Sequence, residues 1–302
     1  MTLAKRVSIG ILAALLVCAV VAIQARGFQY YPGDDRNARS RYLDECNSTD
    51  KAEFYWSRLK YPSQYGDRFG GGGFGRRFGG GGFGFGGRGC GEGFGPWQRD
   101  YPKADIQFLM AMKRLTNVNT RSTSQVVDLD APDSDPHSLN NYPWVYAVQA
   151  ETWSFNAEEA KKMHDYLMKG GFLMVDDFHG AQDWELFMQG LHQFLPNAQV
   201  EDLKDSDEIF HVLFDLSQRF QIPGEQYVWS GRTYEAGAGG DIGYIPGWRA
   251  VRDDKGRIIV AICFNMHLGD AWEWADDPRY PEKFASLAFR VGLNYIVYGM
   301  TH

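Results

Sequence analysis

Short apolar runs alternate with amphipathic segments through the chain from Tyr101 onward. The runs at 144–150 (WVYAVQA) and 172–175 (FLMV) have little polar alternation, which is typical of strands covered on both faces. The segments between them carry apolar residues at intervals of three or four, which predicts helices. This order of strands and helices predicts an α/β fold with a largely parallel sheet and helices on both faces.

The sequence predicts four helices, one of which has clear end signals. Asn156 can cap it, Glu159 follows three residues later as in a capping box, and Gly170 and Gly171 end it. The other three are expected over 102–117, 181–195 and 281–300. In the first of these, the spacing places five residues on a helical pattern: Ile106, Leu109, Met110, Lys113 and Leu115.

Three further segments predict strands. EFYWSRLKY (53–61) alternates well enough for a first strand, and a β-rich stretch lies at 125–129. WRAVRDDKGRIIVAICFN (248–265) predicts two strands joined at Asp254, Lys255 and Gly256. A β-hairpin on the C-terminal side is therefore expected beside the parallel strands.

The first 26 residues differ in character from the rest. Lys5 and Arg6 precede an uncharged, almost wholly apolar segment at 8–23, the order of a signal peptide or short membrane anchor. Either alternative places the rest of the chain in the periplasm or another extracytoplasmic space, anchored in the inner membrane or secreted after cleavage. Residues 27–52 are polar and predict a linker, so the folded domain is expected over 53–302.

A glycine-rich insert interrupts this domain at 66–95, where seventeen residues are glycine. RFGGGGFG occurs at 68–75 and again at 77–84. Such a segment cannot offset its backbone entropy by burial, so we expect a flexible loop.

The net charge bears on the kind of partner that the protein can bind, and the cysteines bear on disulfide formation. A net charge of −7 and a pI near 5.5 argue against a nucleic-acid partner, because phosphate recognition needs a surplus of Lys and Arg. Cys18 lies in the apolar N-terminal segment and Cys263 in a predicted core strand. Cys46 and Cys90 lie in polar surroundings that would face an oxidising compartment, so a disulfide between them is a candidate.

Polar side chains gather where three of the predicted strands end. The carboxyl ends of strands in an open parallel sheet form the edge where ligands bind. Acid, amide and imidazole groups are expected to meet at this edge. The candidate ligand-binding residues are Asp176, Asp177, His179, Asn265, His267, Asp270, Glu273 and Glu151.

Two interpretations of the adjacent Asp176 and Asp177 stay open. Carboxylates at a strand end can cap the next helix and interact with its dipole. Alternatively, Asp176, Asp177 and His267, with His179 as a further ligand, hold a divalent metal ion that activates water. No HExxH motif and no Gly-x-Ser-x-Gly elbow supports a more specific hydrolase assignment.

Four segments together resemble a bacterial family called domain of unknown function 4159, over about residues 53–300. They are RDYPKADIQFLMAMKRLTN, YLMKGGFLMVDDFHG, DEIFHVLFDL and FNMHLGDAWEWADDPRYPE. The resemblance implies a class I glutamine amidotransferase-like, flavodoxin-like fold in proteins of the cell envelope. Amidotransferases have a cysteine at the elbow after the strand, where this chain has Asp176, Asp177 and Phe178, which cannot act as a thiolate.

The leading hypothesis is an exported protein whose domain binds a small polar ligand or an envelope protein without amidotransferase activity. The alternatives are a metal-assisted hydrolase of an envelope glycan or peptide, and a structural subunit of an envelope complex. No organic cofactor is expected, and a divalent metal is the candidate ion. A binding module predicts an aromatic-lined cleft, with Trp272, Trp274 and Trp153 as candidates and core packing as the alternative, favoured for Trp153.

Overall fold

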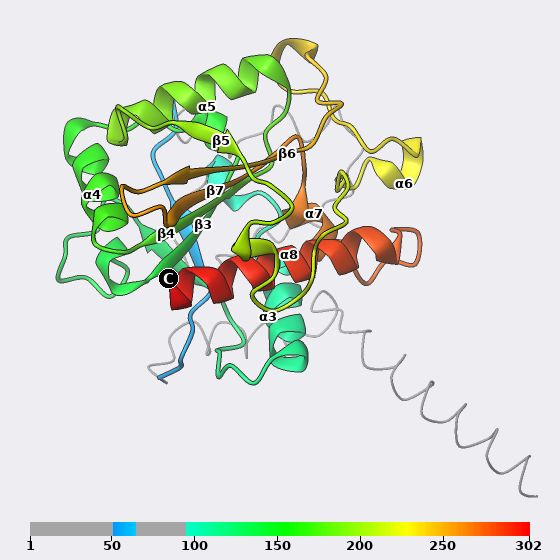
Figure 1. Cartoon of the computed structure of the whole chain (residues 1–302), viewed down its shortest axis with the longest axis horizontal. Helices are drawn as coiled ribbons and strands as arrows, with labels where there is room; N and C mark the ends of the chain where they lie inside the picture. The colour runs from blue at the N-terminus through cyan, green and yellow to red at the C-terminus, as the bar shows by residue number, and fades with distance from the viewer. Residues whose placement is uncertain (1–50, 65–94) are drawn as a thin grey trace, which may run out of the picture. The chain divides into compact units, whose positions relative to one another are not determined.

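Seven strands of the described chain form one mixed sheet in the order β2-β1-β3-β4-β7-β6-β5 (Figure 1). The computed structural model describes residues 51–64 and 95–302. β1, β2, β3, β4 and β7 are parallel, whereas β6 is antiparallel to β7 and to β5. The predicted α/β class and the hairpin are confirmed, and the edge strand β5 was not predicted. The strands are β1 (Ser57–Lys60), β2 (Gln125–Asp128), β3 (Trp144–Val148), β4 (Phe172–Asp176), β5 (Val200–Asp202), β6 (Gly247–Arg252) and β7 (Ile258–Phe264).

The parallel strands keep a register that brings their carboxyl ends to one edge. β3 pairs with β4 from Trp144 opposite Phe172 to Val148 opposite Asp176. β7 continues the sheet on the other side of β4, with Ile262 opposite Val175. The order β2-β1-β3-β4 is that of flavodoxin-like sheets, in which ligands bind outside the carboxyl ends of the strands.

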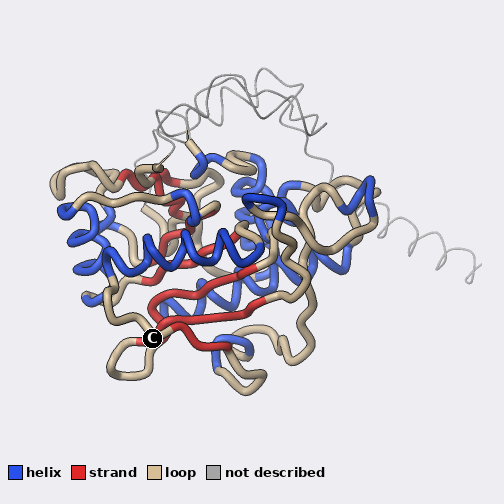
Figure 2. The backbone as a smooth tube through the Cα atoms, turned by 90° about the horizontal axis from the view of Figure 1, so that it is seen from above, coloured by secondary structure: helices blue, strands red, loops and turns tan. Residues whose placement is uncertain are grey.

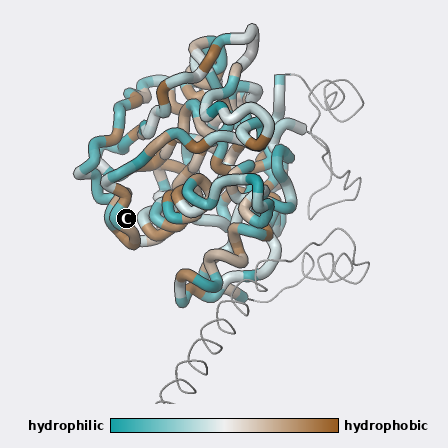
Figure 3. Tube along the Cα trace, turned by 90° about the vertical axis from the view of Figure 1, so that its right-hand side faces the viewer, coloured by the Kyte–Doolittle hydropathy of each residue, from teal (hydrophilic) through white to brown (hydrophobic). Residues whose placement is uncertain are grey.

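Helices cover both faces of the sheet, as the alternating pattern predicted (Figures 1 and 2). One buried cluster joins the sheet to α3, α7 and α8, and a second joins its other face to α4 and α5. Polar and apolar residues alternate along the helical turns (Figure 3), which suits helices with one face on the sheet. The α-helices are α3 (Lys103–Leu115), α4 (Ala157–Met168), α5 (Gly180–Phe194), α6 (Tyr227–Ser230), α7 (Leu268–Glu273) and α8 (Glu282–Thr301). The 3-10 turns are η2 (Pro96–Gln98), η3 (Leu139–Asn141), η4 (Ala150–Thr152), η5 (Glu208–Phe210) and η6 (Ala238–Gly240).

The capping box of α4 is confirmed. The Asn156 side chain accepts hydrogen bonds from the backbone N–H groups of Glu158 and Glu159, and the Glu159 carboxylate accepts one from the Asn156 N–H. After the helix, Gly170 adopts a φ of 114°, which a side chain would disfavour. Local signals alone therefore set both ends of this element.

The buried positions of α3 differ from the pattern predicted for it, apart from Leu109. Leu115 is 50% exposed, whereas the buried positions are Ala104, Asp105, Gln107, Phe108, Leu109 and Met112. The apolar pattern was misleading because a charged residue belongs to the inner face. Asp105 is fully buried and forms an ion pair with the equally buried Arg58 of β1.

Arg58 ties three segments together. Its Nε donates to Asp105 Oδ1 and Oδ2 at 3.2 and 3.1 Å, and its Nη2 lies 2.5 Å from Oδ1. Its Nη1 donates to the backbone carbonyls of Trp97 and Arg99 at 3.1 and 2.9 Å. One guanidinium thus joins β1, α3 and the loop before α3, which leads into the candidate site.

Several predictions concern residues outside the described ranges. They are the signal peptide or anchor at 1–26, the linker up to residue 50, the insert up to residue 94, and the Cys46–Cys90 disulfide. None of the helices within 51–64 and 95–302 has the length and apolarity of a membrane span.

We predict that Arg58→Met lowers the free energy of unfolding by about 3–5 kcal/mol, because it leaves the Asp105 carboxylate buried without its partner. The double variant Arg58→Met/Asp105→Leu should lose less, since the buried charge is then removed as well. Urea denaturation of both variants measures this. Equal losses in the two variants would show that the unpaired Asp105 charge is not the cause.

Candidate functional site

Three neighbouring strands end in left-handed turns at the same edge of the sheet. Gln149, Asp177 and Asn265 directly follow β3, β4 and β7, with φ of 51°, 59° and 58°. Asp100, with φ 63°, precedes α3 and completes the set of non-glycine residues with positive φ in the described chain. Such conformations cost energy and gather at functional sites, where the surrounding structure fixes them.

His267 stands at the centre of this edge, with two carboxylates at each ring nitrogen. Its Nε2 is 3.0 Å from Asp100 Oδ2 and 3.3 Å from Asp177 Oδ2. Its Nδ1 is 3.3 Å from Asp270 Oδ2 and 3.4 Å from Glu235 Oε1. We call these five residues the His267 cluster. One imidazolium can neutralise at most one of the four carboxylates.

The backbone holds the carboxylates on the Nδ1 side. The Gly224 N–H donates to Glu235 Oε1 at 2.8 Å, and the Glu225 N–H donates to Asp270 Oδ2 at 2.6 Å. A Cβ at position 224 would lie 2.5 Å from both carboxylate oxygens and 2.6 Å from His267 Nδ1. Only glycine therefore fits where this backbone crosses the cluster.

On the Nε2 side, Asp177 is less well satisfied. Its side chain is only 5% exposed, yet within the described chain its Oδ2 accepts no hydrogen bond. The nearest positive groups are His267 and the Arg99 guanidinium, whose Nε is 3.9 Å from Oδ2. A buried carboxylate oxygen with free lone pairs is available to a ligand or an ion.

Electrostatics in the cluster reflect a shortage of positive charge. Burial alone would lower the pKa of His267, but the surrounding carboxylates, Asp177 first among them, raise it well above its usual value. Burial raises the pKa of Asp177 and of Asp270 well above the usual range, although His267 opposes this. Burial acts in the same sense on Glu235, but His179 and His267 overcome it and lower its pKa to about 2. Burial also opposes ionisation of Asp100, but His267 overcomes it and lowers the pKa of Asp100. The site therefore combines a charged imidazole with two carboxylates that ionise readily, Asp100 and Glu235, and two that resist ionisation, Asp177 and Asp270.

Asp176 lies outside the cluster and supports α7. Its Oδ2 accepts hydrogen bonds from the backbone N–H groups of Leu268 and Gly269 at 2.7 and 3.0 Å, and from the Tyr146 hydroxyl at 3.0 Å. Burial raises the pKa of Asp176 to about 7. The structure thus shows Asp176 at the start of a helix, as one sequence interpretation expected, but the helix is α7 and not α5.

The other predicted site residues lie around the cluster. His179 is buried, with its Nδ1 3.9 Å from Asp177 Oδ1, and burial lowers the pKa of His179. Asn265 joins the start of α5 to the loop before β6, accepting from the Gly180 N–H at 2.9 Å and donating to the Ile245 carbonyl at 2.7 Å. Glu273 ends α7, where burial and then Asp100 raise its pKa to about 8.

Glu151 lies in η4, directly after the β3 turn. Burial, and then the charges of Asp177 and Asp183, raise the pKa of Glu151 well above its usual value. Within the described chain its buried Oε2 accepts no hydrogen bond. Glu151 is thus a carboxylic acid that senses the charge of Asp177, and no described residue donates a hydrogen bond to its Oε2.

Sequence reasoning missed Asp100, Glu235 and Arg99. Asp100 and Arg99 come from the loop before α3, and Glu235 from the long connection between β5 and β6, neither of which is a strand end. Asp100 does lie in the RDYPK segment that supported the family resemblance, immediately before a helix. For Glu235 the pattern of the sequence contains no comparable signal.

The tryptophans do not form the predicted open cleft. Trp272 is fully buried and packs against Trp56, Phe108 and Tyr146. Trp153 is 3% exposed and belongs to the core, as its alternative interpretation expected. Only Trp274 is partly accessible, at the rim beside Trp229. Helix α7 turns Trp272 inward because the same face carries its other core residues.

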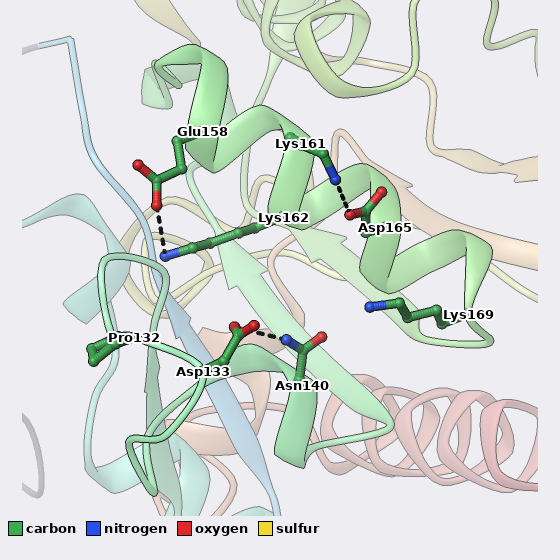
Figure 4. A pocket seen from close by; sticks show the side chains of 8 residues that line it. All are labelled: Pro132, Asp133, Asn140, Glu158, Lys161, Lys162, Asp165 and Lys169. Carbon is green, nitrogen blue, oxygen red and sulfur yellow. Dashed lines mark hydrogen bonds and ion pairs between the residues drawn. The ribbon is translucent and has the colours of Figure 1, made fainter.

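A hollow of about 370 Å³ lies away from these residues, between α4 and the segment before β3 (Figure 4). Its charged side chains largely satisfy one another. Lys161 pairs with Asp165, and Lys162 is 3.8 Å from Glu158. Most of the charges on this surface are thus paired with one another, and Lys169 lines the hollow beside them (Figure 4).

The His267 cluster offers the ligands of a metal site. In the described chain two overlapping sets have ligand atoms that all lie within 4.8 Å of one another: Asp100, His267 and Asp270, and Asp177, Glu235 and His267. Carboxylate oxygens suit Mg²⁺, Ca²⁺ and Mn²⁺, whereas imidazole suits Zn²⁺, Fe²⁺ and other borderline ions. Of the predicted metal ligands, Asp177 and His267 meet here, His179 lies beside them, and Asp176 does not join them. A metal ion at this edge stays a prediction.

We predict unequal effects for alanine at the two adjacent aspartates. Asp176→Ala should lower the free energy of unfolding by about 1–3 kcal/mol, because buried donors at the start of α7 lose their acceptor. Asp177→Ala should cost less than 1 kcal/mol, or stabilise, because it relieves repulsion among like charges. Urea denaturation in a chelator-containing buffer measures both. A larger loss for Asp177→Ala would contradict this division of roles.

Comparison with known proteins agrees with the resemblance of the sequence segments. A search of curated proteins finds no match to this chain. The family described as Domain of unknown function (DUF4159) matches residues 91–300, which include every residue of the His267 cluster. The match covers more than half of the chain, and the protein therefore belongs to this family of unknown function.

Proposed function

We propose that the domain binds a divalent cation at the His267 cluster and uses it to hold a small polar ligand. One observation carries the proposal: four carboxylates surround the buried imidazole of His267, and within the described residues Asp177 Oδ2 accepts no hydrogen bond. The proposal joins the expected polar-ligand binding with the expected divalent metal.

Electrostatics favour a cation over a purely structural cluster. Carboxylates brought together in a buried site repel one another, and one or more must then stay protonated. A divalent ion supplies the missing positive charge and lets the carboxylates ionise. One imidazole among carboxylate oxygens is a mixed ligand set, for which Mn²⁺ is an apt first probe.

The strained turns support the same conclusion. Asp100 and Asp177 hold left-handed backbone conformations, and both place a carboxylate oxygen near His267 Nε2. Evolution tolerates such strain where a side chain must point at a ligand. If these residues had only a structural role, apolar side chains at this edge of the sheet would pack equally well.

Export is a separate part of the proposal. It is supported by the order of charged and apolar residues in 1–26, which lies outside the described ranges. We infer that the cation site acts in the periplasm or another extracytoplasmic space, where partners from the envelope are accessible.

We predict that saturating Mn²⁺ raises the melting temperature of the chain by about 5–10 °C when the free ion is about a hundredfold above its dissociation constant. His267→Gln and Asp177→Asn should each abolish most of the shift, because each removes a ligand. Differential scanning calorimetry with Mn²⁺, Zn²⁺ and Mg²⁺ measures the effect and ranks the ions.

Asp254→Asn is the matched control, since Asp254 is exposed in the turn before β7, at the opposite end of the sheet. It should keep the full shift. No shift for the unsubstituted chain, or an equal shift in His267→Gln, would reject the cation site. The structural-subunit hypothesis would then stand as the better account.

Metal-assisted hydrolysis is a second candidate, favoured by Glu151. Its buried Oε2, which accepts no hydrogen bond from the described residues, and its raised pKa suit a group that would take or give a proton during such a reaction. Screening p-nitrophenyl acetate, phosphate and glycosides with Mn²⁺ present tests for such activity.

For any activity found, we predict that Glu151→Gln lowers kcat by about 10²–10⁴-fold, the usual contribution of general acid–base catalysis. The Mn²⁺-dependent rise in melting temperature should be unchanged in this variant. Unchanged kcat would exclude Glu151 as the proton-transferring group.

A further inference from the structure

The guanidinium of Arg99 lies at the rim of the His267 cluster and makes few contacts with the described residues. Its side chain is 55% exposed, and its contact with the cluster is the 3.9 Å approach of Nε to Asp177 Oδ2. The guanidinium makes no hydrogen bond to the residues that the structure describes. An arginine that only balanced Asp177 would gain more from a close bidentate pair.

The backbone of Arg99 is held firmly, although its side chain makes only the 3.9 Å contact with Asp177 among the described residues. Its carbonyl accepts a 2.9 Å hydrogen bond from Nη1 of Arg58, which is itself buried against Asp105. The next residue, Asp100, turns into the left-handed region and sends its carboxylate to His267 Nε2. Consecutive residues of one fixed loop thus place an anion inside the cluster and a cation outside it.

The neighbouring lysine does not offer the same group. Lys103 Nζ lies 3.0 Å from Asp276 Oδ1 and 5.4 Å from the centre of the Trp274 ring, so it already has an anion and an aromatic face. The charges of Asp177 and Asp100 raise the pKa of Arg99, although burial opposes them, so Arg99 stays charged at every relevant pH.

We propose that the ligand of this site is a small anion, with a phosphate or carboxylate group that bridges the bound cation and the Arg99 guanidinium. The inference rests on the proposed cation site. A planar fork of N–H donors matches the oxygens of either group, and a divalent ion beside it binds the same oxygens. Without the ion, the carboxylates of the cluster would repel an anion, so binding of the anion requires the cation.

The test separates the two steps. Electron paramagnetic resonance of free Mn²⁺ first counts the ions bound by the full chain and by Arg99→Gln. Isothermal titration calorimetry of the Mn²⁺-loaded proteins with methyl phosphate and with acetate then measures anion affinity. Arg99→Lys keeps the charge without the fork, and Lys255→Gln removes an exposed charge from the turn before β7 as the matched control.

We expect the same number of bound Mn²⁺ ions in Arg99→Gln, with equal or higher affinity because a nearby positive charge is gone. Anion affinity should fall about tenfold to a hundredfold, with a smaller loss in Arg99→Lys and none in Lys255→Gln. The anion with the greater loss identifies the group that the site prefers. Equal anion affinity in Arg99→Gln, or no anion binding by the Mn²⁺-loaded unsubstituted chain, overturns this inference and leaves the cation site standing. Absence of Mn²⁺ binding overturns both.

Discussion

The buried ion pair between Arg58 and Asp105 determines where the loop before α3 runs, and that loop supplies two groups of the site. Both side chains are fully buried, so the pair replaces the water that either charge would need. The remaining donor capacity of Arg58 goes to the carbonyls of Trp97 and Arg99. Because the carbonyl of Arg99 is fixed, the turn at Asp100 is fixed too, and its carboxylate reaches His267.

The strands contribute the rest through their shared register. β3, β4 and β7 end at one edge, and the left-handed residue after each of them redirects the chain across that edge. The last residue of β4 and the residue after it then have different roles. Phe172, Met174 and Asp176 face the helices α3, α7 and α8, so Asp176 meets the start of α7. Asp177 leaves the strand and meets His267.

Charge in this site is arranged so that a cation and an anion can be bound one after the other. Four carboxylates around His267 leave a surplus of negative charge inside, and the exposed Arg99 side chain places positive charge outside. The close passage of Gly224 over Asp270 and Glu235 shields the inner side. A bound cation would convert an edge that repels anions into one that attracts them. The cation must therefore bind before the anion.

The sequence by itself determined the elements that depend on neighbours along the chain. The capping box of α4, the apolar strands β3 and β4, the hairpin of β6 and β7 and the α/β class all follow from spacing within about twenty residues. It also placed Asp177, His267 and Asp270 at one edge, because parallel strands bring their carboxyl ends together.

Only the tertiary structure decided which other residues belong to the site and what role each residue has. Arg58 and Asp105 read as surface charges in a sequence, and their burial depends on each other across 47 positions. Glu235 arrives from a connection without periodic pattern, and Trp272 turns inward because its partners come from the residue before β1, from β3 and from α3. Long-range pairing of charges and rings has no local signature, since its energy appears only when distant segments pack together.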